Sequence, residues 1–196
     1  MEYLSTCIAD RMCTINVISE SDKEFYAYSV QLLLEKTIGI ILICLFAAVF
    51  RKLFEVVAFL VVFSLIRIHS DGIHCKTSIG CFVSSVLISL STIQISALLM
   101  NSPGICQGGL ILSMIFIFCV GTIRNPNLDP TEQELVHLKK CSRLGISIIG
   151  SLVFIILFLF PDNCFVYYSA LGVIYNALSL MIVKIKGEEE VEDDKN

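Results

Sequence analysis

Long apolar runs separated by short polar segments dominate this chain. A helix that crosses a bilayer needs about 20 mostly apolar residues, and two of the uncharged tracts are long enough for two such helices each. Residues 79–123 carry no charge, and between 144 and 183 the only charged residue is Asp162. The apolar segments run approximately over 36–50, 53–66, 79–100, 105–123, 144–160 and 164–183. The pattern predicts an all-α polytopic membrane protein with six transmembrane helices.

The first 23 residues have a different pattern. Leu4, Ile8, Met12 and Ile15 recur at helical spacing, with charged residues off that stripe. Such a stripe is typical of a short amphipathic helix in the plane of a membrane interface, or of a helix packed on the protein itself. We therefore predict an amphipathic N-terminal helix over 1–23, a membrane domain over 24–186 and an acidic, disordered tail over 187–196.

The composition supports a membrane protein and argues against a soluble domain, a nucleic-acid-binding protein and a disulfide-linked fold. Hydrophobic residues make up 56% of the 196 residues and charged residues only 16%, a balance that soluble domains rarely tolerate. The net charge of −4 comes largely from the tail, and no basic patch with interleaved aromatic residues occurs, so nucleic acid is not an expected partner. The nine cysteines are odd in number and several lie inside apolar runs, which argues against a disulfide framework.

The distribution of basic residues predicts the orientation. If six helices cross, twelve of the 14 lysines and arginines lie on the side of both termini, and only Arg51 and Lys52 lie on the other. Under the positive-inside rule, both termini are then cytoplasmic. The polar segments 67–78 and 124–143 become cytoplasmic loops of a multi-pass protein in the cell membrane.

The polar segment before the third apolar run, together with the start of that run, contains the side chains best suited to catalysis. His74 precedes Cys81 by seven positions, and Thr77-Ser78 can cap a helix that starts there. The partial positive charge at a helix N-terminus lowers the pKa of a thiol, and a neighbouring imidazole can take its proton. This pattern indicates a cysteine nucleophile with a histidine base at the edge of the bilayer.

The spacing sets a geometric condition on that pair. Seven residues on one continuous helix extend about 10.5 Å, too far for an imidazole to reach a thiol. The segment 67–78 must therefore fold back at the turn dipeptide Asp71-Gly72, and Asp71 is the nearest candidate to orient the imidazole. A polar loop with an incidental cysteine is the alternative. The segment contains His, Cys and Asp residues, which can bind zinc, but it lacks the CxxC or HxxxH spacing of a zinc site. Neither a metal nor another cofactor is therefore expected.

At these residues the chain resembles the AgrB-type accessory gene regulator proteins, which are membrane-embedded cysteine endopeptidases of Gram-positive bacteria. That family shows an Arg, then Gly-Gly-x-His-Ala, and a Cys seven residues after the His. Here the matching residues are Arg67, Asp71-Gly72, His74-Cys75 and Cys81, with Asp71 in place of the first glycine and Cys75 in place of a small residue. The Pro- and Asn-containing segment after the fourth apolar run also resembles the family, and the resemblance covers nearly the whole chain.

The resemblance implies an activity and a partner. Such proteins cleave a small AgrD-like precursor peptide through an acyl-enzyme thioester on the catalytic cysteine, with the histidine as base. They promote cyclisation of the product to an autoinducing peptide of quorum sensing. Catalytic roles would fall to Cys81 and His74. The alternative is a non-enzymatic small membrane transporter or a scaffold for peptide export, although the helices contain few of the ionisable residues that mark transport pathways.

Basic residues on the same side could bind the acidic part of the precursor. Lys139, Lys140, Arg143 and Arg67 are the candidates, and the ordinary positive-inside bias is the alternative explanation. His137 is interpreted as a solvated loop residue. The sequence leaves the oligomeric state open, with a homodimer as one alternative.

Overall fold

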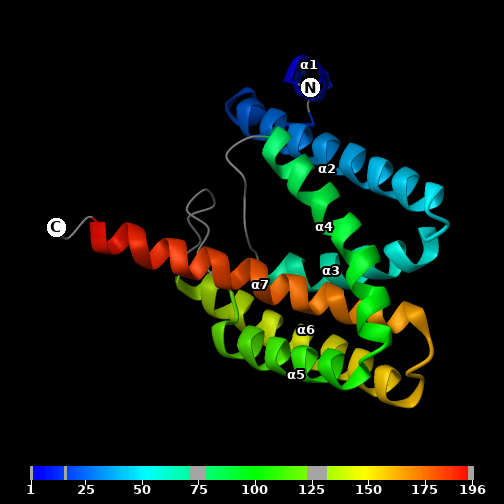
Figure 1. The fold of residues 1–196 in the computed structure, drawn as a ribbon. Coiled ribbons are helices and arrows are strands. Elements are labelled where there is room, and N and C mark those ends of the chain that lie inside the picture. Colours follow the sequence, from blue (N-terminus) through cyan, green and yellow to red (C-terminus); the bar gives the residue numbers. More distant parts are fainter. Residues whose placement is uncertain (1, 16, 71–77, 123–131, 194–196) are drawn as a thin grey trace. The chain divides into compact units, whose positions relative to one another are not determined.

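The computed structural model describes residues 2–15, 17–70, 78–122 and 132–193 (Figure 1). Within these ranges all regular elements are helices, so the predicted all-α class is confirmed for the described residues. In chain order they are α1 (Glu2–Thr14), the short 3-10 helix η1 (Glu20–Asp22), α2 (Lys23–Val49), α3 (Leu53–Ser70), α4 (Ser78–Met100), α5 (Pro103–Val120), α6 (Glu132–Leu159) and α7 (Cys164–Asp193).

Two helices begin earlier than the apolar runs predict. α2 starts at Lys23, although the run was expected to begin at residue 36. α6 starts at Glu132, so the assignment of 124–143 to a loop is wrong for residues 132–143. The physical reason is that backbone hydrogen bonds propagate a helix through polar residues as readily as through apolar ones. Hydrophobicity marks the part of a helix that suits a bilayer, and it does not mark the helix ends.

The chain forms two compact units, and α4 contributes to both. The first unit contains α1, α2 and α4 up to Ile88. Within it, α1 packs on α2, and Lys23 Nζ lies 2.6 Å from Asp10 Oδ1. The buried residues of α1 are Ser5 and Ala9, whereas Leu4 of the predicted apolar stripe is exposed. The placement of that stripe in a membrane interface stays a prediction.

The second unit contains α3, α4 from Ser89 onward, α5, α6 and α7. α7 lies at its centre and packs on α3, α5 and α6. In the apolar stretch of α7, 61% of the residues are buried inside the protein. The corresponding share is 17–28% in the other helices that are long and apolar enough to cross a membrane. Tyr175 of α7 shares a hydrogen bond of 2.6 Å with Ser91 of α4. The core of this unit is made by Ile66, Cys106, Leu110, Ile117, Ile146, Val153, Leu157, Val166, Tyr167, Ala170, Val173, Ala177 and Leu180.

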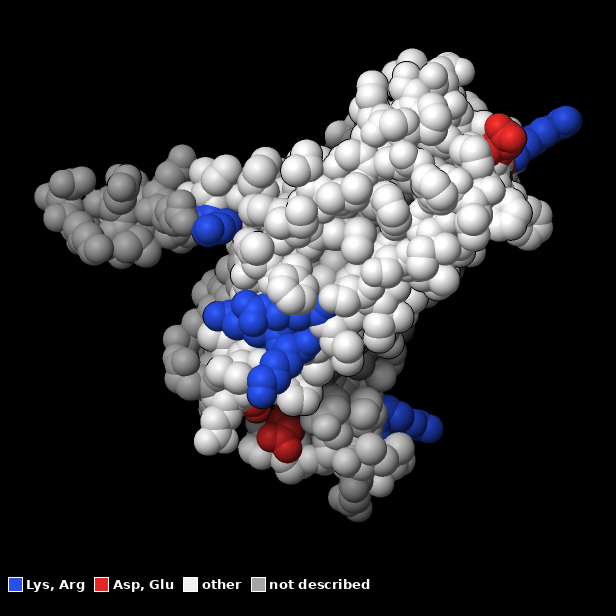
Figure 2. Space-filling model, turned by 90° about the horizontal axis from the view of Figure 1, so that it is seen from below, with Lys and Arg blue, Asp and Glu red and all other residues white. Residues whose placement is uncertain are grey.

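Among the described residues, five helices are long and apolar enough to cross a membrane. They are Glu20–Val49, Val83–Met100, Pro103–Val120, Gln133–Leu159 and Cys164–Ile185. α3, which has 18 residues, is not among these five. On the face drawn in Figure 2, uncharged residues make up most of the described surface, as expected for helices that contact lipid. The count of six crossings and the orientation stay predictions.

Candidate functional site

The backbone of Cys81 lies in the first turn of α4, which begins at Ser78. This is the position that the Thr77-Ser78 capping pattern predicts. Backbone N–H groups in the first turn of a helix lack partners inside the helix and favour a nearby negative charge. The hydroxyl of Ser84 donates a hydrogen bond of 2.7 Å to the carbonyl oxygen of Gly80, within the same helix. The position of Cys81 therefore suits a thiolate.

The expected base lies outside the described residues. His74 and Asp71 belong to segment 71–77, which falls between the end of α3 at Ser70 and the start of α4 at Ser78. The side chain of Cys81 is also outside the described part. The Cys/His pair and the orienting role of Asp71 therefore stay predictions. The structure does describe the residues that hold the end of α3, which precedes this segment.

The end of α3 is fixed by a buried hydrogen bond from another part of the chain. The hydroxyl of Thr122 donates to the carbonyl oxygen of Ser70 over 3.2 Å. Ser70 is fully buried and Thr122 is 5% exposed, so water does not compete for either group. The Ser70 hydroxyl itself donates to the Ile66 carbonyl oxygen at 3.0 Å. The last residue of α3 is thus bonded through both its carbonyl and its hydroxyl group.

A second buried bond holds the turn that carries Thr122. Gly121 has φ 74°, a conformation that costs a glycine little, and its N–H donates to Ile117 at the end of α5 over 2.7 Å. Its carbonyl oxygen accepts a hydrogen bond of 2.8 Å from Ser142 of α6, which is 2% exposed. A Cβ at position 121 would lie 3.2 Å from Lys139 Cγ, so α6 also packs closely on this turn.

The basic residues of α6 differ in their surroundings. Arg143 Nε donates to the carbonyl oxygen of Phe118 over 3.0 Å, and its guanidinium lies 5.7 Å from the centre of that ring. Lys139 packs its stem on Gly121, whereas Lys140 is exposed. Of the three, Arg143 thus takes part in the packing of α5 on α6, and Lys140 and Arg143 are the two exposed residues.

Arg67 lies inside the second unit. Its Nη1 is 3.4 Å from the hydroxyl of Ser179 on α7, and its guanidinium lies 5.5 Å from the centre of the Phe63 ring. Arg67 is half-buried near the end of α3. Its contacts join α3 to α7, so a role in substrate binding would be additional to a role in helix packing.

The structure shows a thiol and imidazole pair on α6 that is not among the predicted site residues. Cys141 Sγ lies 3.7 Å from Nδ1 of His137, and both residues belong to α6. The interpretation of His137 as a loop residue is therefore wrong, although the side chain is exposed. The signal was available, because residues four positions apart lie on the same face of a helix. The prediction of a loop over residues 124–143 conceals this signal, because a loop lacks the helical spacing.

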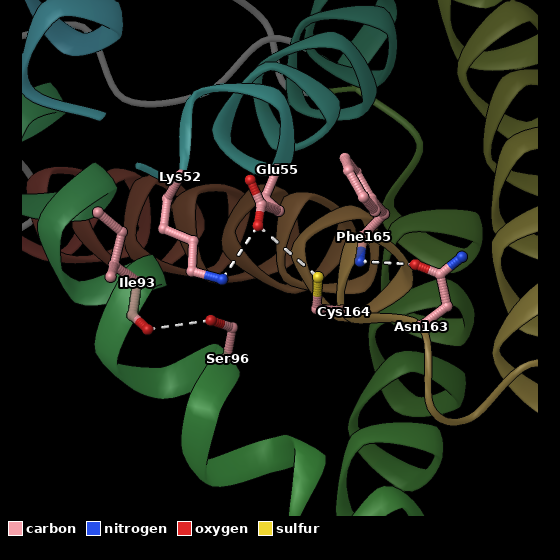
Figure 3. A network of polar contacts seen from close by, with 7 residues as sticks. All are labelled: Lys52, Glu55, Ile93, Ser96, Asn163, Cys164 and Phe165. Carbon is pink, nitrogen blue, oxygen red and sulfur yellow. Dashed lines mark hydrogen bonds and ion pairs between the residues drawn. The ribbon is translucent and has the colours of Figure 1, made fainter. Parts of the chain in front are cut away.

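A polar network joins the start of α3 to the start of α7, and no sequence pattern predicts it (Figure 3). Glu55 is 9% exposed, and its Oε1 accepts from Lys52 Nζ at 3.0 Å and from the thiol of Cys164 at 3.7 Å. The hydrogen bond to Glu55 raises the pKa of Lys52 above its ordinary value. Next to Cys164, the side-chain oxygen of Asn163 accepts from the backbone N–H of Phe165 at 3.0 Å and caps α7. This network ties the first turns of two helices that are distant in sequence.

The part of the chain that the structure describes contains no group of three or more His, Cys, Asp or Glu side chains that could hold a metal ion. Ligands for zinc are usually three or four such side chains converging on one point. The described pairs, such as His137 with Cys141, do not reach that number.

Comparison with known proteins places the chain in a family. The family model described as accessory gene regulator B matches residues 5–182. No curated protein sequence matches the chain, and no solved structure does. The family match includes the described helices from α1 to most of α7, together with Cys81 and the segment that contains His74. The chain belongs to the accessory gene regulator B family.

Proposed function

We propose that this chain is a membrane cysteine endopeptidase that cleaves an AgrD-like precursor peptide and promotes its cyclisation to an autoinducing peptide. Family membership over residues 5–182 is the observation that carries the proposal, because it associates the chain with autoinducing-peptide processing in quorum sensing. The position of Cys81 in the first turn of α4 supports the chemical part of the proposal. There the helix N-terminus favours the thiolate form of a cysteine.

In the proposed first step, the Cys81 thiolate attacks the scissile carbonyl carbon after His74 has taken the thiol proton. The tetrahedral intermediate collapses, the peptide C–N bond breaks, and His74 returns the proton to the leaving amine. The N-terminal part of the precursor is then held as a thioester on Cys81. The C-terminal part leaves as a free peptide.

In the proposed second step, a cysteine or serine side chain of the precursor attacks that thioester. His74 takes its proton and gives it to the sulfur of Cys81 as the new thioester or ester bond forms, so the enzyme thiol is regenerated. The product is a cyclic thiolactone or lactone. A site at the membrane edge that excludes water would favour this internal attack over hydrolysis.

We place the active-site segment and both termini on the cytoplasmic face, where the basic side chains meet the precursor. Lys140 is exposed, and Lys139 and Arg143 are close to it on α6. An acidic precursor segment would be attracted to these charges. Arg67, which contacts Ser179, is the remaining candidate for contact with substrate. Asp71 would orient the imidazole of His74, and a homodimer is one arrangement compatible with the proposal.

Coexpression with the cognate precursor tests this function. Cys81→Ala and His74→Ala should each abolish the cleaved and cyclised products, detected by mass spectrometry. The matched controls are Cys141→Ala and His137→Ala, because that pair is the described thiol and imidazole contact on α6. These two variants should retain processing. Wild-type levels of product from both Cys81→Ala and His74→Ala would overturn the proposed function.

A further inference from the structure

A groove lies between α5 and α6 at the surface of the second unit. It has a volume of about 330 Å³ and is lined by Ile111, Met114, Ile115, Ser151, Phe154 and Ile155, which we call the groove residues. Five of these six side chains are apolar, and Ile115 and Ile155 are both exposed. Because α5 and α6 are long and apolar enough to cross a membrane, the groove is suited to contact with the hydrocarbon of a bilayer.

Close packing of the two helices holds the groove in shape. Gly150 of α6 is buried, and a Cβ at this position would lie 2.8 Å from Cε of Met114 on α5. The absence of a side chain at Gly150 therefore lets Met114 pack directly against the backbone of α6. A groove whose lining is fixed in this way needs little ordering when a ligand binds, and less ordering means a smaller entropic cost.

A fixed guanidinium group lies beyond one end of the groove. Arg143 shares a face of α6 with Ser151 and Phe154, which follow it by 8 and 11 residues. Its Nε donates to the carbonyl oxygen of Phe118 on α5 over 3.0 Å, and its guanidinium lies 5.7 Å from the centre of the Phe118 ring. This bond uses one of the five N–H donors of the exposed arginine. The donors of a guanidinium can pair with two oxygens of one phosphate.

A second positive charge lies close to Arg143. Lys140 is exposed and precedes Arg143 by three residues, so the two side chains are neighbours on one face of α6. Basic residues next to a membrane attract anionic lipid headgroups by about 1 kcal/mol each. The polar end of the groove is therefore complementary in charge to a lipid phosphate.

The distance from the charges to the groove matches the length of one lipid leaflet. Ser151 and Ile155 follow Arg143 by 8 and 12 residues, which corresponds to about 12 and 18 Å along the helix axis. The hydrocarbon core of a bilayer is about 30 Å thick, so one leaflet contributes about 15 Å. A phospholipid with its phosphate at Arg143 would thus have an acyl chain long enough to reach the groove residues.

We propose that the α5–α6 face of the second unit is a binding site for one anionic phospholipid. Arg143 binds the phosphate, Lys140 adds to the attraction, and one acyl chain lies in the groove. Burial of apolar surface against the groove residues and pairing of the phosphate with Arg143 then stabilise the same complex. The inference goes beyond the proposed function and does not depend on it, because neither the precursor nor Cys81 takes part.

The first experiment measures lipid affinity of the full chain by native mass spectrometry. Delipidated protein in a nonionic detergent is titrated with phosphatidylglycerol, and with phosphatidylcholine of the same acyl chains. One phosphatidylglycerol should bind at least about fivefold more tightly than phosphatidylcholine. Arg143→Gln should weaken phosphatidylglycerol binding about five- to tenfold, and Lys140→Gln about two- to fivefold. Lys184→Gln is the matched control, because it removes one exposed positive charge from α7 and should change the affinity less than about twofold.

A second experiment locates the acyl chain. The full chain is reconstituted in vesicles of phosphatidylcholine that contain a small share of phosphatidylglycerol with a photoactivatable group in one acyl chain. After illumination, peptide mass spectrometry should find the cross-links concentrated in residues 111–118 and 151–155. Ser151→Phe fills the groove without changing any charge and should remove most of these cross-links. Leu152→Phe is the control, because Leu152 is exposed on α6 but is not one of the groove residues.

Each of several results would overturn the lipid site. These are equal affinities for the two lipids, cross-links spread evenly over the other apolar helices, and an Arg143→Gln affinity equal to that of Lys184→Gln. Stabilisation by inorganic phosphate alone to the same extent as by phosphatidylglycerol would reduce the site to an anion site without a chain. A lipid-free dimer that Ser151→Phe dissociates would assign the groove to a second copy of the chain instead.

Two further variants keep the test independent of folding and of catalysis. Should Arg143→Gln not fold, Lys140→Gln and Ser151→Phe decide the question, because both leave the contact between Arg143 and Phe118 in place. Cys81→Ala, which should abolish processing, should bind phosphatidylglycerol as the wild type does. A failure of the proposed peptidase function would therefore leave the lipid site standing, and the reverse also holds.

Discussion

The side-chain amide of Asn176 donates a hydrogen bond of 3.0 Å to the carbonyl oxygen of Phe63 and joins α7 to α3 inside the second unit. The amide also donates to Gly172 at 2.9 Å. Asn176 is fully buried, and its side-chain oxygen has no hydrogen-bond partner among the described residues. The residue therefore contributes to the packing of these two helices through its donors alone.

The loss of stability on replacing Asn176 should depend strongly on which side chain takes the place of the two amide donors. Asn176→Leu removes two donations together with the unpartnered oxygen, and we expect a loss of about 1 kcal/mol in the free energy of unfolding. Asn176→Asp places acceptor oxygens beside the carbonyl oxygens of Phe63 and Gly172 and should cost about 3 kcal/mol or more. Thermal unfolding in detergent measures the difference. Equal Tm values for the two variants would contradict this account.

Gly172 permits the close approach of the same two helices. A Cβ at this position would lie 3.1 Å from the Phe59 carbonyl oxygen and 3.2 Å from the Phe63 nitrogen, which are backbone atoms that cannot rotate away. Gly172→Ala should therefore destabilise the protein by about 1–3 kcal/mol. Gly145→Ala in α6 is the control, because nothing lies within 4 Å of a Cβ there. This control should be neutral or stabilising by up to about 1 kcal/mol, since alanine favours a helix.

The Lys52–Glu55 contact predicts a dependence of stability on pH. The hydrogen bond to Glu55 raises the pKa of Lys52 in the folded protein, so the folded state binds its proton more tightly than the unfolded state. The resulting stability is fully present below the unfolded pKa of about 10.4 and is lost as pH rises through the higher folded pKa. Lys52→Met should lower Tm at pH 8, and the deficit should shrink above about pH 10.4. A deficit that grows with rising pH would contradict the assignment.

Thiol reactivity should differ between Cys81 and Cys13. Burial, with the negative charge of Glu20 as a further cause, raises the pKa of the Cys13 thiol above its ordinary value. The proposed base and helix N-terminus should have the opposite effect at Cys81. At pH 7, Cys81 should therefore be alkylated at least about tenfold faster than Cys13, as followed by peptide mass spectrometry. Denatured protein supplies the control, in which the two rates should converge. A slower Cys81 would argue against thiol activation.

Labelling of introduced cysteines tests the predicted orientation. Lys140 is exposed near the start of α6, and Asn101 is exposed in the turn between α4 and α5. If six helices cross, Asn101→Cys should react with a membrane-impermeant maleimide in intact cells, and Lys140→Cys should react only after the cells are broken. The reverse pattern would place the active-site segment outside the cell and would remove the basis for steering of the precursor by cytoplasmic charges.

The sequence by itself determined the helical class and the identity of the candidate nucleophile and base. Apolar runs report burial or lipid contact locally, so they locate helices such as α4 and α5 from neighbouring residues alone. The spacing of His74 and Cys81 and the resemblance at Arg67 are likewise local patterns. The ends of α2 and α6 could not be predicted in this way, because polar residues extend a helix without any change in its backbone geometry.

The tertiary structure decided which distant residues meet. The partners Glu55 and Cys164 are 109 positions apart, Ser70 and Thr122 are 52 apart, and Phe63 and Asn176 are 113 apart. No periodicity in the sequence relates such residues, since their contacts depend on how whole helices pack. Burial then gives these contacts their importance, because a polar group removed from water must find a partner. The sequence names the residues that could perform the reaction, whereas the packing of distant helices brings Thr122 to the end of α3 at Ser70.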